Sequence, residues 1–335
     1  MGFHRNEVGA NANGGTELMR DLLEQSLDSK LLDNFQIFMS RPRELDQSKI
    51  RLIQCHDLAE DPESRKFGDQ NFRNAFHKLL FISNWQFQRY QLIHQIPYDQ
   101  QCAVIETGIV PAPIDCLQSK PTDKISIVYT STPQRGLDIA VDVIDYLSTI
   151  HKEIHFDVFS SFKIYGWDSA DAQFQPLYDK IQAHPNMTYH GFVSNAKLKD
   201  HLNKAHIFAY PSTWMETSCR AMLEAMSAGL VCVHPNYGAL AETSGMLNLI
   251  YQGDINDNNR HAQTFAEYLN AAIEFVKSGN HTHHIEFNKA FVDRRYNIEK
   301  IAAQWNSMMQ SLCEQYPTEQ SRKQPSQMFV YNTRC

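Results

Sequence analysis

Short apolar runs recur along the chain, separated by longer stretches in which apolar and polar residues alternate at helical spacing. Most runs are apolar at consecutive positions, which is typical of strands covered on both faces. They predict ten strands, at residues 35–39, 50–54, 78–82, 102–106, 125–130, 155–159, 187–190, 206–210, 230–233 and 248–251.

The stretches between the runs favour helices. One face of residues 137–150 shows the spacing most clearly, because its apolar residues recur at steps of three and four. They are Leu137, Ala140, Val141, Ile144, Leu147 and Ile150. The pattern predicts eight helices, at residues 16–27, 84–95, 137–150, 171–183, 195–203, 217–228, 262–277 and 298–312. Alternating strands and helices are the pattern of βα units on a parallel sheet, so the expected fold class is α/β.

A proline-rich segment at residues 110–124 divides this pattern. Pro111, Pro113 and Pro121 interrupt the periodicity, and a new strand follows at 125. We predict an N-terminal domain at residues 1–118 and a C-terminal domain at 119–296. A helix at 297–316 and a polar, loosely ordered tail at 317–335 complete the chain.

Composition narrows the class of protein. The chain has 335 residues, enough for two domains of ordinary size, and its net charge of −7 argues against a nucleic-acid-binding protein. The seven cysteines are scattered without a Cys-x-x-Cys pair, which indicates free thiols in a reducing compartment. We find neither an apolar stretch of membrane-spanning length nor a secretion signal. These observations predict a cytoplasmic protein without a transmembrane segment.

The most informative segment is residues 206–233. An apolar strand leads into Pro211 and Ser212, then a carboxylate at Glu216, a helix with a second carboxylate at Glu224, and another apolar strand. At 1.5 Å per helical residue the two glutamates would lie about 12 Å apart. Two acceptors at that distance suit the ends of an extended ligand, with helix-start N–H groups for an anion between them. A Glu pair at this spacing also arises by chance about once in such a chain, so the strand context carries the argument.

This combination resembles the signature of the retaining glycosyltransferases of family 4. Their GT-B fold has two Rossmann-like domains that face each other across a cleft. The resemblance implies that Glu216 faces the donor sugar and that Glu224 holds the ribose of a nucleoside diphosphate sugar. It also places the amides of Ser218 and Cys219 at the start of the helix beside the donor, and it implies that the helix at 297–316 crosses back to the N-terminal domain.

Two further segments belong to the predicted donor site. Gly14 and Gly15 allow close approach of the backbone to a ligand, and Thr16 is a plausible N-cap, although a flexible turn before a capped helix is the alternative. The resemblance implies that both glycines face the donor phosphates and the acceptor. Arg135 precedes Gly136 where the family has a Lys-Gly pair, and a cation there would stabilise the leaving diphosphate.

The sequence departs from the family pattern at other points. Thr130 and Ser131 stand where the family has a second cation, and Lys163 is our candidate substitute, with a solvated surface lysine as the alternative. Residues 1–13 contain no apolar run, so the first domain is expected to be small, with four or five strands and without the usual opening strand. His56 follows a strand and could bind donor sugar or acceptor, or serve as a structural loop histidine.

The sequence shows no recognisable metal or cofactor motif. His281, His283 and His284 lack partner ligands at a recognisable spacing and indicate a polar loop, and no Asp-x-Asp occurs. No Gly-x-Gly-x-x-Gly or P-loop pattern occurs either. We therefore expect no metal in the catalytic site and no cofactor besides the donor substrate.

Together with the residue pattern, the family 4 resemblance implies a metal-independent retaining hexosyltransferase. It would move a sugar from a nucleoside diphosphate donor to a hydroxyl of a glycan, lipid or small-molecule acceptor, with Glu216, Arg135 and His56 in catalysis. Two alternatives stay open. One is a GT-B epimerase or hydrolase, and the other is a degenerate relative that binds a sugar or a protein partner without catalysis.

Overall fold

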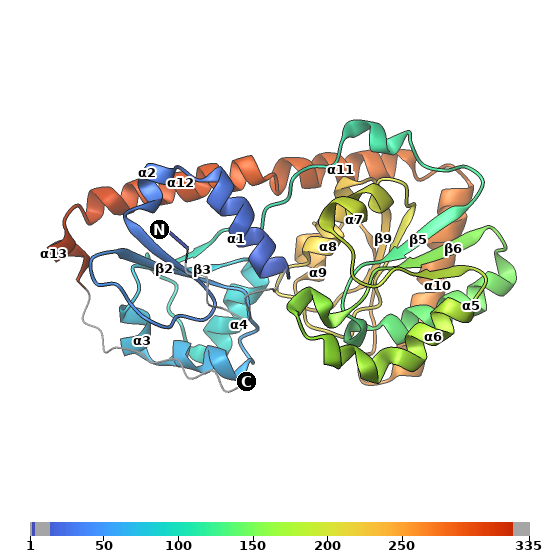
Figure 1. The fold of residues 1–335 in the computed structure, drawn as a ribbon, viewed down its shortest axis with the longest axis horizontal. Coiled ribbons are helices and arrows are strands. Elements are labelled where there is room, and N and C mark those ends of the chain that lie inside the picture. The colour runs from blue at the N-terminus through green and yellow to red at the C-terminus, as the bar shows by residue number, and fades with distance from the viewer. Residues whose placement is uncertain (1, 4–13, 324–335) are drawn as a thin grey trace. The chain divides into compact units, whose positions relative to one another are not determined.

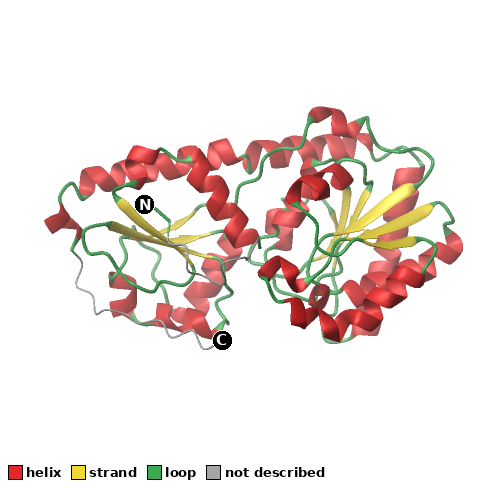
Figure 2. Ribbon diagram, in the orientation of Figure 1, coloured by secondary structure: helices red, strands yellow, loops and turns green. Residues whose placement is uncertain are grey.

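The computed structural model describes residues 2–3 and 14–323, which form two compact units. The first unit contains the described residues up to Gly108 together with those from Ile298 onward, and the second spans Ile109–Asn297. Each unit has one parallel β-sheet with helices packed on it (Figures 1 and 2). The predicted α/β class with two Rossmann-like domains is confirmed.

The first unit has a four-stranded sheet in the order β1-β2-β3-β4. The strands are β1 (Phe35–Met39), β2 (Ile50–Cys55), β3 (Lys78–Phe81) and β4 (Cys102–Val104). All neighbours are parallel, with Phe35 opposite Ile50 and Leu79 opposite Cys102. The helices are α1 (Gly15–Ser26), α2 (Ser29–Leu32), α3 (Gln70–Asn74), α4 (Asn84–His94), α12 (Ile298–Gln315) and α13 (Glu319–Arg322).

Helix α12 completes the core of the first unit. It runs beside α1 (Figure 1) and turns Ile301, Trp305 and Met309 inward at steps of four residues. Trp305 is fully buried and contacts Phe3, with ring centroids 6.4 Å apart. Helix α12 therefore belongs structurally to the first unit.

The second unit has a six-stranded sheet in the order β10-β9-β8-β5-β6-β7. The strands are β5 (Ile125–Tyr129), β6 (Ile154–Val158), β7 (Met187–Tyr189), β8 (Ile207–Ala209), β9 (Val231–Pro235) and β10 (Leu249–Tyr251). The helices are α5 (Leu137–Ile150), α6 (Gln175–Ala183), α7 (Asn195–Leu202), α8 (Arg220–Ser227), α9 (Leu240–Thr243), α10 (Asn258–Lys277) and α11 (Thr282–Arg295). Every residue of β5, β8 and β9 is buried, as expected for strands covered on both faces.

The chain passes between the units earlier than predicted. We expected the boundary at 118/119, but the proline-rich segment packs on the second unit and the division falls at 108/109. The N–H of Ala112 donates to Ser227 Oγ (2.8 Å), and the buried Lys289 donates to the carbonyl of Ala112 (2.6 Å). Proline breaks secondary structure, but it does not prevent a segment from lying against a core.

The predicted strands are all present, with ends shifted by at most two residues. Helices were predicted less completely. The helix expected at 171–183 is α6, and a 3₁₀ segment at Asp168–Phe174 precedes it. The helix expected from residue 262 is α10, which starts earlier, at Asn258. Asp257 caps it there by accepting from the N–H groups of Asn259 and Arg260. The sequence analysis missed five helices: α2, α3, α9, α11 and α13.

The polar loop predicted at His281–His284 is wrong. His281 is the N-cap of α11, and the next three residues form its first turn. Ile285 and Val292, one on each side of the buried Lys289, anchor this helix to the core. The sequence analysis missed this helix because its first turn is polar and its apolar contacts begin only at its fourth residue, Ile285.

Corrections also apply at both ends of the chain. Thr16 is not the N-cap of α1, because the helix begins at Gly15 and its cap is Gly14. The tail predicted from Pro317 begins with a helix, and Arg322 donates to the carbonyl of Ser48 (3.2 Å) and to Asn34 Oδ1 (3.1 Å). Residues 324–335 lie outside the described residues.

The prediction of a missing opening strand concerns residues 1–13, of which only Gly2 and Phe3 are described. Phe3 makes a single parallel bridge to Ile37, and the carbonyl of Gly2 accepts from the N–H of Ile37 (2.7 Å). Within the described residues the first sheet has four strands, in line with the four or five predicted.

Candidate functional site

A buried ion pair joins two strand ends in the second unit. Arg135 Nη1 lies 2.6 Å from Glu216 Oε1, and the Tyr210 hydroxyl donates to the same oxygen (2.5 Å). Glu216 is only 6% exposed, while the side chain of Arg135 retains 21% of its surface. No contact among the described residues uses the second oxygen of Glu216, Oε2. The pair therefore presents a fixed carboxylate oxygen and a partly exposed guanidinium.

The turn after β5 positions Arg135. Pro133–Arg135 forms a single 3₁₀ turn, and Gly136 then adopts φ +94° before α5 begins. A Cβ at Gly136 would lie 2.1 Å from the carbonyl oxygen of Pro211, so only glycine fits here. This contact holds the Arg135 turn against the segment that follows β8 and carries Glu216.

The turn after β9 supports Glu216 from the other side. Gly238, with φ +60°, packs so closely that a Cβ would lie 2.6 Å from both the backbone N and the backbone O of Glu216. The N–H of Ala239 donates to the carbonyl of Glu216 (2.7 Å). Three neighbouring strands, β5, β8 and β9, thus fix the ion pair at the carboxyl edge of the sheet, where open α/β sheets bind ligands.

The electrostatics of the pair favour the charged state of Arg135. Burial by itself would lower its pKa, but the carboxylate of Glu216 raises the pKa of Arg135 well above its ordinary value. Burial, together with Glu216, raises the pKa of Tyr210 well above the usual value, so its hydroxyl remains a donor. Trp214 adds a cation–π contact, with Arg135 Cζ 5.7 Å from its ring centroid.

The second glutamate lies on α8, which begins later than predicted. The helix starts at Arg220 instead of Thr217, and Cys219 is its N-cap without a side-chain capping bond. Ser218 therefore precedes the helix, and the 12 Å separation inferred from helical rise does not apply, because residues 216–219 are not helical. Glu224 Oε1 accepts from Arg220 Nε (3.1 Å), an i,i+4 pair.

The structure leaves the predicted role of Lys163 untested. Its side chain is 57% exposed and lies 3.9 Å from Asp168 Oδ1. This geometry matches the solvated lysine that we kept as the alternative.

Three of the predicted site residues, Gly14, Gly15 and His56, lie in the first unit. Gly14 is buried at the cap of α1, and a Cβ at the exposed Gly15 would contact nothing within 4 Å. His56 Nε2 lies 3.2 Å from both Gln54 Oε1 and Met39 Sδ, and its backbone N–H donates to Ser40 Oγ (2.8 Å). Burial lowers the pKa of His56 to about 4, so its ring is neutral near pH 7.

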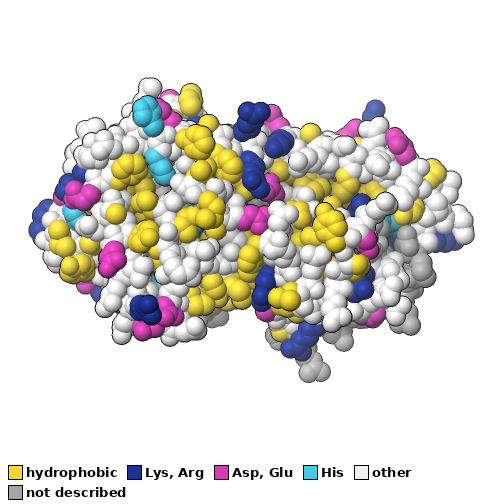
Figure 3. Space-filling model, turned by 180° about the vertical axis from the view of Figure 1, so that it is seen from behind, with side chains coloured by type: hydrophobic (Ala, Val, Ile, Leu, Met, Phe, Trp, Pro, Cys, Tyr) yellow, Lys and Arg dark blue, Asp and Glu magenta, His cyan; other side chains and the backbone are white. Residues whose placement is uncertain are grey.

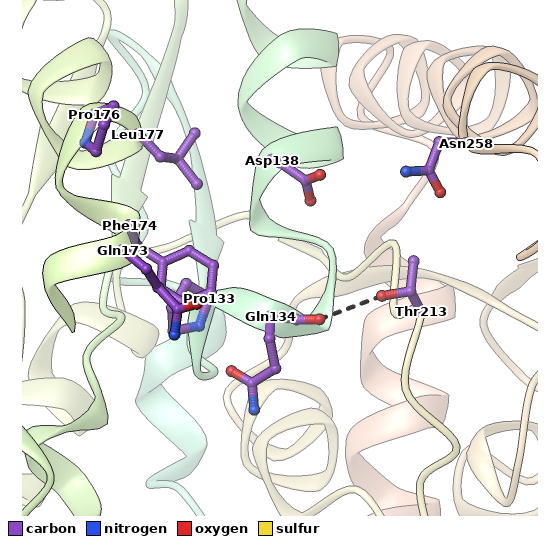
Figure 4. Close-up of a pocket in the computed structure, with 9 residues that line it drawn as sticks. All are labelled: Pro133, Gln134, Asp138, Gln173, Phe174, Pro176, Leu177, Thr213 and Asn258. Atoms are coloured by element: carbon purple, nitrogen blue, oxygen red, sulfur yellow. Dashed lines mark hydrogen bonds between the residues drawn. The ribbon is translucent and has the colours of Figure 1, made fainter. Parts of the chain in front are cut away.

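A pocket adjoins the Arg135 turn within the second unit. Its volume is about 370 Å³, within the range of small-molecule sites. Figure 4 shows it beside the start of α5, with Thr213 Oγ1 donating to the carbonyl of Gln134 (3.3 Å). The lining residues are Pro133, Gln134, Asp138, Gln173, Phe174, Pro176, Leu177, Thr213 and Asn258. Because they come from separate segments, sequence reasoning did not find this pocket.

Comparison with known families identifies the family of this chain. The sequence model of the glycosyl transferases group 1 matches residues 119–310, more than half of the chain and all the residues of the ion pair. The chain belongs to this family. No curated protein sequence matches this chain significantly.

Solved structures agree with this glycosyltransferase in fold. A glycosyltransferase from Rickettsia africae is 13% identical with a TM-score of 0.66, covering 93% of this chain and 84% of its own. The pneumococcal O-GlcNAc transferase GtfA, described in complex with UDP and GlcNAc, is 13% identical with a TM-score of 0.63, covering 88% and 59%. Anabaena Alr3699/HepE, described in complex with UDP, is 16% identical with a TM-score of 0.60, covering 88% and 82%.

Three residues at this candidate site of the group 1 glycosyltransferase escaped the sequence analysis. Arg220 could have been found, because it stands four residues before Glu224, the spacing of a helical ion pair. Tyr210 ends an apolar strand and was counted only as core. Trp214 carries no sequence signal for its contact with Arg135, which depends on the packing of separate turns.

Two properties of the whole glycosyltransferase complete the description. No helix among the described residues is both long and apolar enough to cross a bilayer. On the face shown in Figure 3, acidic and basic side chains are interspersed and do not form a field of one sign.

Proposed function

We propose that this glycosyltransferase transfers a hexosyl group from a nucleoside diphosphate sugar to an acceptor hydroxyl with retention of configuration. The observation that carries the proposal is the buried pair of Arg135 and Glu216 at the carboxyl edge of the second sheet. Its arrangement supports the roles that the family 4 resemblance implies for both residues.

The two residues of the pair have complementary tasks in this proposal. Arg135 would bind the diphosphate, whose negative charge grows as the bond to the sugar breaks. Its exposed surface and its unpartnered Nε leave it free to donate to phosphate. Glu216, held through Oε1 by Arg135 and Tyr210, would accept a donor-sugar hydroxyl with Oε2.

Helix α8 supplies the remaining donor contacts in the proposal. Glu224 would accept from the ribose hydroxyls, and backbone N–H groups around Ser218 and Cys219 would face the phosphates. Arg220 is a better candidate than Lys163 for the second cation, since it is largely buried at the helix start and its Nη1 lacks a partner. Lys163, Gly14, Gly15 and His56 stay predictions.

No protein nucleophile is needed for this reaction. The departing phosphate would take the proton of the acceptor hydroxyl while the acceptor attacks from the same face, so catalysis rests on positioning and on charge stabilisation. The acceptor would be a glycan, a lipid or a small molecule, and catalysis would use no metal. All six described cysteines are free thiols, which supports a reducing compartment such as the cytoplasm.

The first experiment is a thermal-shift screen against UDP, GDP, ADP and CMP and their sugars. UDP leads the panel because solved neighbours are described with UDP bound. A ligand at 100 times its Kd should stabilise the protein by about 2.7 kcal/mol. Silence across the panel would favour the non-catalytic relative over the transferase. Product analysis with donor alone would identify an epimerase or hydrolase.

Two variants test the assigned roles. Glu224→Ala should weaken donor binding, and Glu216→Ala should lower turnover by roughly a hundredfold or more, as expected for the loss of a group that stabilises the transition state. Glu286→Gln, on the exposed side of α11, is the control. Unchanged kinetics in both site variants would refute the assignment.

A further inference from the structure

Three potential metal ligands meet on the second unit, apart from the ion pair. Among the described residues, Asp157, His190 and His201 form the one group whose ligand atoms all lie within 4.8 Å of one another. Asp157 is on β6, His190 directly follows β7, and His201 is in the last turn of α7. Asp157 is opposite Thr188 in the parallel register, which brings His190 to the same end of the sheet.

The surroundings fix these side chains in place. His190 Nε2 lies 2.8 Å from Asp157 Oδ1, while Ser126 Oγ donates to the other carboxylate oxygen (3.1 Å). The His190 ring stacks on Phe159 at 4.4 Å with an interplanar angle of 4°, and the ring centroids of His190 and His201 are 4.9 Å apart. A hydrogen bond to the second oxygen of a ligating carboxylate is a common feature of metal sites.

Two imidazoles and a carboxylate suit zinc, which is often held by three protein ligands with the fourth position open. With bonds of about 2.1 Å, tetrahedral ligand atoms lie about 3.4 Å apart, so the 2.8 Å contact would open by roughly half an ångström.

We propose that Asp157, His190 and His201 bind a divalent transition-metal ion of the zinc class. The fourth position is open to water, because the nearby His155 Nε2 is already hydrogen-bonded to Thr188 Oγ1 (2.9 Å). The site shares no residue with the Arg135–Glu216 pair, and it takes no part in the proposed transfer. Its effect is structural, because the ion ties the three-residue edge strand β7 and helix α7 to β6.

Nearby charges limit the affinity. Lys197 and Lys204 repel positive charge at His201. The carboxylate of Asp157 offsets part of this repulsion. Binding should therefore be selective for zinc-like ions that favour imidazole, and Mg²⁺ and Ca²⁺, which favour oxygen ligands, should not bind.

The test is calorimetric titration of Zn²⁺ into chelator-treated full-length protein, with Co²⁺ absorption as a probe of tetrahedral nitrogen and oxygen ligands. We expect one ion per chain and a raised melting temperature. His201→Ala and Asp157→Asn should each weaken binding at least about a hundredfold, since losses even at supporting residues reach that size. His283→Ala is the matched control, because its side chain is 99% exposed on the same unit.

The outcomes separate the alternatives. An absence of Zn²⁺ binding would show that the cluster is a hydrogen-bonded network only. Binding that persists unchanged in both variants would assign the ion to other members of the 15 histidines. Circular dichroism and thermal melting without metal show whether each variant folds. If Asp157→Asn does not fold, Zn²⁺ binding by His201→Ala tests the proposal. None of these measurements depends on transferase activity.

Discussion

Gly136, which directly follows Arg135, and Gly238 both pack against the backbone of the segment that carries Glu216. Both have positive φ, and at both a Cβ would meet backbone atoms closer than 3.0 Å. Side chains yield to such crowding more easily than backbone does. The geometry of the ion pair therefore depends on two residues that contribute no functional group.

Gly136→Ala should destabilise the protein. The left-handed conformation costs roughly 1–3 kcal/mol for a non-glycine residue, and the 2.1 Å approach to the Pro211 carbonyl adds to it. Gly15→Ala is the control, since its Cβ would be in open space and alanine favours helices. Urea unfolding monitored by fluorescence measures both variants, and equal stabilities would contradict this reading of the turn.

At the scale of elements, helix ends were harder to predict than helix faces. Helix α12 shows why faces are predictable, since Ile301, Trp305 and Met309 repeat at steps of four and all are buried. Helix α8 shows why ends are not. Its apolar periodicity extends back towards Thr217, but Met215 and Glu216 are held by the Gly238 turn, and the helix begins only at Arg220.

Trp305→Ala should cost the first unit about 3–5 kcal/mol of unfolding free energy, the usual loss for a buried large aromatic side chain. Gln304→Ala changes the neighbouring exposed position on the same helix and should alter stability by less than about 0.5 kcal/mol. Denaturant titration of both variants tests the contribution of α12 to the core. A loss of similar size in the two variants would mean that helix propensity, not burial, is responsible.

At the scale of the whole molecule, each unit contains its own hydrophobic core and its own buried neutral histidines. Burial lowers the pKa of His56 and His77 in the first unit and of His206 and His234 in the second, each to about 4. Unfolded, these rings have a pKa near 6.5, so between pH 6.5 and pH 4 the unfolded chain binds more protons.

Stability should therefore be fully present above about pH 6.5 and fall as the pH drops towards 4. His234 alone could contribute as much as about 3 kcal/mol, at 1.36 kcal/mol per pKa unit, because its unpartnered Nε2 would become a buried charge. Urea titrations at pH 8, 6, 5 and 4.5 measure the slope. His234→Gln should flatten it, and His283→Gln, at an exposed position, should not. A profile that stays level down to pH 4.5 would rule out this linkage.

The resemblance to the family pattern allowed Glu216, Glu224 and Arg135 to be selected from the sequence, and the structure pairs Arg135 with Glu216. The sequence did not reveal Tyr210 as the second donor to Glu216, nor the cation–π contact of Trp214 with Arg135. Those contacts join turns that follow different strands. The cluster of Asp157, His190 and His201 has the same origin, since 44 residues separate its first and last members and no local spacing marks it.

Apolar periodicity within a short window of chain was enough to predict the strands, most helix faces and the α/β class. The starts of helices, the point where the chain passes between units and the pairing of polar groups follow from tertiary packing. Those features depend on backbone packing between segments that are distant in sequence, such as Gly238 against Glu216 and Ala112 against Ser227. The local sequence pattern cannot predict these contacts, because neither segment by itself specifies the distant segment against which it packs once the sheet has assembled.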